Sequence, residues 1–202
     1  MKKYLKFSFF IITAFVFQFC SKSNSSVELT IVSFNPSVDK NLTELKSSLK
    51  EQFYIDSIYT IKAELPQEAY YEPRNRYRAD KLIRYLRDNY NTEKVIGITD
   101  KDISTTSGEY EDWGIMGLAF RPGKSCVIST YRTFRNAKSE EHKKERLKKV
   151  VFHEFGHTLG LPHCENSDSC LMTDANGKVS TVDKVTDFCP KCKTKIKKYL
   201  RN

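Results

Sequence analysis

Three of the four histidines in the chain lie between residues 153 and 163, in the stretch HEFGHTLGLPH. His153 and His157 are four residues apart, which on a helix means about 40° of rotation and about 6 Å of rise. Both imidazoles would therefore face the same side of the helix and could share one metal ion. Glu154 follows the first of them and would reach water activated at the metal rather than the metal itself.

A third ligand requires the chain to leave the helix. Gly160 can end it, because glycine adopts the left-handed conformation at little cost and turns the chain back. His163 would then complete a site of three nitrogens with an open fourth position, which is the arrangement of a catalytic zinc. The remaining histidine, His142, has no such neighbours and is expected to be an ordinary surface or core residue.

Four cysteines lie close to the histidines in the sequence: Cys164, Cys170, Cys189 and Cys192. A CxxC pair with two further thiols upstream is a common layout for a zinc cage. The alternative is a pair of disulfides, which would suit an exported chain. Because CxxC forms a tight and reactive loop, the pattern favours zinc. Cys126 lies in an apolar stretch and is expected to be a buried hydrophobic residue.

The combined pattern HExxHxxGxxHC–x5–CxM, followed by CxxC, resembles that of the archaemetzincins, a family in the metzincin clan of zinc peptidases. Three further stretches are similar to that family. Residues 76–88 resemble its second helix, 95–103 its strand before the site, and 115–132 its edge strand and the strand that follows. The resemblance extends over roughly residues 27 to 200.

This resemblance implies a catalytic zinc with three ligands, His153, His157 and His163, and Glu154 as general base and acid. It also implies a second, structural zinc held by Cys164, Cys170, Cys189 and Cys192. The chain would thus bind two zinc ions. Met172 would form an apolar floor beneath the catalytic ion. The implied activity is hydrolysis of a peptide or protein substrate, held in extended form by the edge strand within residues 114–120. Some metzincins stabilise the oxyanion with a tyrosine after the methionine; only Tyr199 follows here, so the sequence does not identify that residue.

The periodicity of apolar residues predicts an α+β fold around these groups. Strands are predicted at 27–34, 54–65, 94–100, 114–120 and 125–134, and helices at 39–53, 78–90 and from near Ser139 to Gly160. We expect a metzincin-like twisted mixed sheet with packed helices and an active-site helix. An irregular C-terminal subdomain would hold the four-cysteine zinc site. With 202 residues, 39% of them hydrophobic, one domain at 27–202 is expected.

The N-terminus has the pattern of an export signal. MKKYLK is basic, and residues 7–19 form an uncharged apolar run that is short for a membrane span. Residues 1–19 are therefore predicted to be a signal peptide. Cys20 would carry a lipid, with residues 20–26 as a linker, in a membrane-anchored lipoprotein of the periplasm or cell surface. Phe19 stands where a small residue normally precedes a lipidated cysteine, so export without lipid, or an uncleaved anchor, is the alternative.

The chain has a formal net charge of +9, with basic clusters at 143–149 and 191–201. Such clusters can bind nucleic acid or anionic membranes. No phosphate-binding glycine loop, aromatic–basic stacking pattern or zinc-finger helix accompanies them, so we expect solvated helix faces, no nucleic-acid partner and a monomer. Two other functions remain open. One is a zinc-containing surface binding or adhesion protein, against which an intact Glu154 argues; the other is a hydrolase of non-peptide amides.

Overall fold

The fold is taken from a computed structural model, which describes residues 27–200. The predicted signal peptide and the linker with Cys20 lie outside the described residues. Within the described part, no helix is both long enough and apolar enough to cross a membrane.

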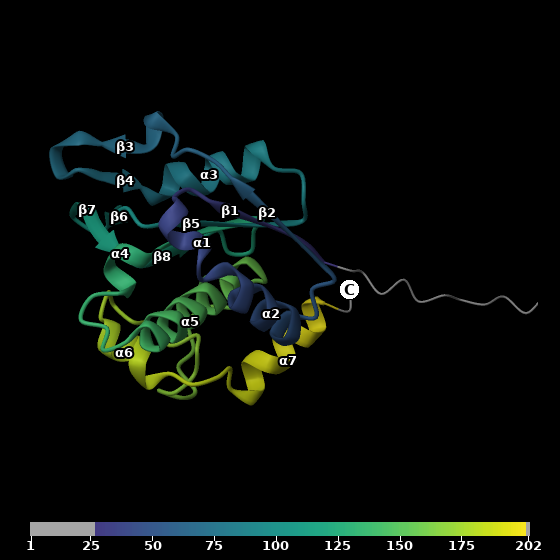
Figure 1. Cartoon of the computed structure of the whole chain (residues 1–202). Coiled ribbons are helices and arrows are strands. Elements are labelled where there is room, and N and C mark those ends of the chain that lie inside the picture. The colour runs from purple at the N-terminus through teal and green to yellow at the C-terminus, as the bar shows by residue number, and fades with distance from the viewer. Residues whose placement is uncertain (1–26, 201–202) are drawn as a thin grey trace, which may run out of the picture.

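A five-stranded sheet forms the centre of the molecule, in the order β2-β1-β5-β9-β8 (Figure 1). Its strands are β1 (Glu28–Ser33), β2 (Ser57–Lys62), β5 (Lys94–Thr99), β8 (Gly117–Ala119) and β9 (Ser125–Ser129). The first four in this order run parallel, and β8 pairs antiparallel with β9 at the edge. Parallel strands covered on both faces are near-continuous apolar runs, and β5 is buried at every position. The predicted mixed sheet with a strand near Gly117 at its edge is confirmed.

Helices cover both faces of this sheet: α3 (Ala79–Asn89) one face, and α2 (Leu42–Phe53) and α5 (Glu140–Thr158) the other (Figure 1). Alternate residues along each strand point to opposite faces. Ile96 and Ile98 therefore join the core beneath α2 and α5, while Val95 joins the core beneath α3. All three helices lie within the ranges that the sequence predicts.

A second sheet was not predicted. Its order is β3-β4-β6-β7, with strands β3 (Tyr70–Tyr71), β4 (Arg76–Arg78), β6 (Ile103–Ser107) and β7 (Tyr110–Ile115). Short 3₁₀ turns at Gln67–Ala69 and Glu72–Arg74 flank β3. The single strand predicted at 114–120 is therefore wrong in one respect: Ile115 ends β7 in the second sheet, and Gly117 begins β8 in the first.

Two further predictions need correction. The strand predicted at 125–134 stops at Ser129, whose side chain accepts a hydrogen bond from the Tyr131 backbone N–H and caps the short helix α4 (Thr130–Thr133). The C-terminal part is less irregular than expected, because it contains α6 (Val179–Lys184) and α7 (Pro190–Tyr199). A short helix α1 (Pro36–Asp39) precedes α2.

Candidate active site and metal centres

The three histidines of the motif converge at one end of α5. His153 and His157 lie one turn apart on the helix, with their Nε2 atoms 3.1 Å from each other. The helix ends at Thr158, and Gly160 takes a φ of 84°, in the left-handed region. The chain then turns back, so that ligand nitrogens of all three histidines lie within 4.8 Å of one another. The predicted convergence of His163 on the helical pair is confirmed.

Backbone carbonyls fix the orientation of the two helical histidines. The Nδ1 of His153 lies 2.7 Å from the Leu171 carbonyl, and the Nδ1 of His157 lies 2.7 Å from the Leu161 carbonyl. A carbonyl only accepts, so each Nδ1 donates and each Nε2 keeps its lone pair for a metal. Burial lowers the pKa of His153 to about 3 and that of His157 to about 4. Both rings are therefore neutral at pH 7, the form in which histidine binds metal.

Asp174 is a residue of the site that the sequence did not indicate. Its carboxylate lies 3.4 Å from the Nδ1 of His163, so an acidic group stands beside the third histidine. No spacing rule marks this aspartate, because it approaches from the loop that follows Met172. Because the Nδ1 atoms of His153 and His157 are hydrogen-bonded to carbonyls, their Nε2 atoms are left to bind a metal. For zinc–nitrogen bonds of about 2.0–2.1 Å, tetrahedral geometry places ligand nitrogens about 3.3 Å apart, close to the distance between His153 and His157.

Glu154 faces the same cleft as the histidines and is buried. It lies against Gly117 of the edge strand. A Cβ added to Gly117 would stand 2.6 Å from the Cγ of Glu154 and 2.7 Å from its Oε1, so any larger residue here would displace this carboxyl group. Burial, with a smaller contribution from the charge of Asp174, raises the pKa of Glu154 to about 8. A dication held by the histidines would oppose this shift, because an opposite charge nearby favours the ionised carboxylate.

Met172 is fully buried and lies against α5. A Cβ added to Gly156 would be 2.7 Å from its sulfur, so the glycine between the two helical histidines lets the methionine approach. The Met172 carbonyl accepts a hydrogen bond of 2.8 Å from the Cys164 backbone N–H. The side chain thus packs against α5 beside the two helical histidines.

The cleft in front of these groups has a volume of about 550 Å³. Its walls are the edge strand β8, the β6–β7 hairpin, α5, the loop after Leu171, and α6. Tyr199 is elsewhere: its ring lies 4.8 Å from the Nζ of Lys94 and does not line the cleft.

The four downstream cysteines form a second cluster, with all sulfur atoms within 4.8 Å of one another. Cys164 and Cys189 are 3.7 Å apart, and Cys170 and Cys192 are 3.8 Å apart. Zinc–sulfur bonds of about 2.3 Å in a tetrahedron place the sulfurs about 3.8 Å apart. All four are free thiols, as is the fully buried Cys126. The sulfur separations therefore fit a tetrahedral zinc site.

One loop joins the two clusters. Cys164 directly follows His163, and Cys170 directly precedes Leu171, whose carbonyl orients His153. The Leu171 backbone N–H also donates to the Asp187 carbonyl, just before Cys189. The position of the loop between His163 and Leu171 thus depends on the cysteine cluster.

Comparison with known proteins agrees with this geometry. The sequence model of peptidase family M54 matches residues 15–198. An archaemetzincin of Natronomonas pharaonis is 34% identical over 178 residues, covering 84% of this chain and 98% of the relative. That of Halobacterium salinarum is 33% identical over 161 residues, covering 76% and 90%.

Solved structures of two archaemetzincins have the same fold. The protein of Methanopyrus kandleri superposes with a TM-score of 0.77 at 26% identity, covering 89% of this chain and 98% of its own. That of Archaeoglobus fulgidus gives 0.70 at 27% identity, covering 84% and 99%. The chain therefore belongs to the archaemetzincins, peptidase family M54, and is a zinc metallopeptidase.

Proposed function

We propose that this protein hydrolyses peptide bonds with zinc bound by His153, His157 and His163, and with Glu154 as the proton-transferring group. The convergence of the three histidines on one cleft, beside a buried carboxyl group, carries the proposal. Zinc in such a site supplies a Lewis acid for the scissile carbonyl and makes water nucleophilic near neutral pH. Family membership favours this activity over an adhesion module or a hydrolase of other amides.

Each neighbouring group has a role in this scheme. Glu154 accepts the proton of the attacking water and passes it to the leaving amine. Asp174 and the Leu161 and Leu171 carbonyls keep the imidazoles oriented. Strand β8 is paired with β9 on one side only, so its other side offers backbone groups to an extended peptide.

We also propose a second, structural zinc on Cys164, Cys170, Cys189 and Cys192, giving two zinc ions per chain. The sulfur separations that match a tetrahedral cage support this count. A further proposal is that the protein is exported and anchored to a membrane by lipid on Cys20. The apolar run that ends at Phe19 and the polar linker after it support this location.

A peptide library digested by the zinc-loaded protein and read by mass spectrometry tests the activity. The wild type should cleave library peptides, cleavage should stop when the zinc is chelated, and it should return when zinc is added back. His157→Ala should lose both cleavage and one zinc ion. His142→Ala is the matched control, because that histidine contacts Asp183 and does not line the cleft. Cleavage that persists in His157→Ala would refute the assignment.

A further inference from the structure

One wall of the cleft has no part in the chemistry described above. The β6–β7 hairpin lines it with five residues that carry no charge: Thr105, Thr106, Ser107, Trp113 and Ile115. Trp113 is the single tryptophan of the chain, is 43% exposed, and pairs with Thr105 across the ladder. An indole combines a large apolar face with one polar N–H, and such rings dominate the energetics of many binding sites.

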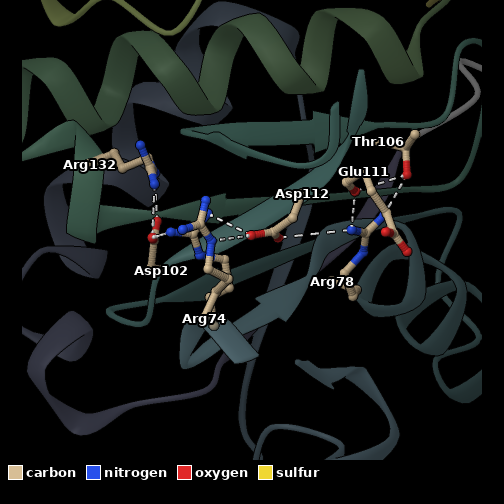
Figure 2. Close-up of polar contacts among 8 residues, drawn as sticks. Arg74, Arg78, Asp102, Thr106, Glu111, Asp112 and Arg132 are labelled. Atoms are coloured by element: carbon tan, nitrogen blue, oxygen red, sulfur yellow. Dashed lines mark hydrogen bonds and ion pairs between the residues drawn. The ribbon is translucent and has the colours of Figure 1, made fainter. Parts of the chain in front are cut away.

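The opposite face of the same hairpin is held by ion pairs. Side chains alternate along a strand, so Asp112 and Gly114 point away from the face that carries Trp113. Figure 2 shows the Asp112 carboxylate among arginines. It lies 3.3 Å from Arg74 and 3.2 Å from Arg76, and its side chain is 10% exposed. The Arg76 side chain is 14% exposed, so this pair holds β4 against β7 in a partly desolvated position.

A second contact ties the hairpin to the main sheet. Arg132, in the short helix that follows β9, binds Asp102 through two hydrogen bonds of 2.6 and 2.9 Å (Figure 2). Its guanidinium lies so close to Gly114 that a Cβ there would be 2.0 Å from it. Arg78 also donates to the Thr106 hydroxyl at 2.8 Å. Trp113 thus faces the cleft from a strand whose opposite side is held at several points. Binding a substrate therefore costs little conformational entropy in this strand.

Building on the peptidase function proposed above, we propose that Trp113 is a substrate-binding residue that selects a bulky apolar side chain, aromatic or large aliphatic. Gly117, beside Glu154, marks the reacting end of the cleft, and four positions separate it from Trp113. Extended chain spans about 3.3 Å per residue, so these four positions place the selected side chain at most about four residues from the scissile bond. The hairpin wall itself carries no charge to pair with an acidic or basic side chain; the charged residues of the cleft, such as Arg121, Lys149 and Asp174, lie on its other walls.

The test compares cleavage profiles of the wild type, Trp113→Ala and a control on the same peptide library. Tyr59→Ala is the control, because it removes a half-exposed aromatic ring from β2, at the other edge of the sheet. The wild type and the control should share a preference for bulky apolar residues at one position away from the scissile bond. In Trp113→Ala this preference should vanish, with kcat/KM about tenfold lower for such peptides and unchanged for their alanine-substituted counterparts. An unchanged profile would overturn the proposal.

Tryptophan fluorescence gives a readout that does not depend on turnover. The zinc-loaded Glu154→Gln variant is titrated with a preferred peptide carrying phenylalanine at the selected position, and with the same peptide carrying alanine. Emission should shift to shorter wavelength only with phenylalanine; equal responses would refute the subsite.

A wild type that cleaves no library peptide would refute the proposed function and this subsite with it. Normal cleavage with an unaltered Trp113→Ala profile would refute the subsite alone.

Discussion

Replacing Gly117 with alanine should disable Glu154 without touching a ligand or the proton acceptor itself. The new Cβ would stand 2.7 Å from Oε1 and 2.8 Å from Cδ of Glu154, whereas carbon atoms pack at about 3.5–4.0 Å. The carboxyl group must therefore move by about 1 Å. Gly117 is not among the glycines with positive φ, so alanine fits the backbone. A misplacement of about 1 Å at a reacting group can cost about 10²-fold, and we expect a loss of that size in kcat.

The assay is a double-mutant cycle on a peptide substrate, with zinc content and thermal unfolding measured in parallel. If Gly117→Ala acts through Glu154, it should cost about 10²-fold in the wild type and nothing further in the Glu154→Gln background. Both single variants should keep the zinc of the wild type. An equal loss in both backgrounds would mean that the new methyl group obstructs the peptide along β8 instead, and the role given to the contact with Glu154 would be wrong.

Three other outcomes are expected. Cys189→Ser should lose one zinc ion by metal analysis and destabilise the C-terminal helices, because structural metal binding is itself folding free energy; an unchanged zinc count would contradict the cage. Hydrogen bonds from the Arg146 guanidinium, and to a lesser extent from His142, hold the pKa of Asp183 well below its usual range. The ionised Asp183 therefore stabilises the fold above its unfolded pKa of about 3.9, and this stabilisation is lost as the pH falls below that value. Denaturant titrations should therefore show Asp183→Asn less stable than the wild type at pH 7, with the gap closing in acid; a constant gap would argue against the ion pair. Mass spectrometry of the native N-terminus should find a mature chain that starts at a lipid-modified Cys20, and an unmodified Cys20 would exclude the anchor.

The convergence of the three histidines was predictable because their spacing follows from helix geometry. His153 and His157 must share a face if the stretch is helical, and Gly160 is the residue type that lets a helix end and turn back. The core strands were predictable for a similar reason, since a buried parallel strand such as β5 is a continuous apolar run.

The second sheet could not be predicted, because contacts far apart in the sequence hold it. Strand β4 has the sequence RYR and has no apolar alternation; it is stabilised by ion pairs to Asp102 and Asp112. The end of β9 was misjudged because the β-branched Thr130 suggested more strand, whereas the Ser129 cap starts a helix. Helix α7 buries only Cys192 and Ile196, too few apolar residues to give a periodic signal. Asp174 was missed because its role depends on where a loop returns.

The most direct measurement of the central claim is peptide cleavage by Glu154→Gln together with its zinc content. Glutamine keeps the size and the hydrogen bonding of the side chain but cannot accept the proton. We expect kcat to fall by about 10²–10⁴-fold or more, with zinc content and thermal unfolding unchanged, because the three histidines and most of the core are left intact. A Glu154→Gln protein that retains its zinc and cleaves peptides at a rate near that of the wild type would contradict the mechanism.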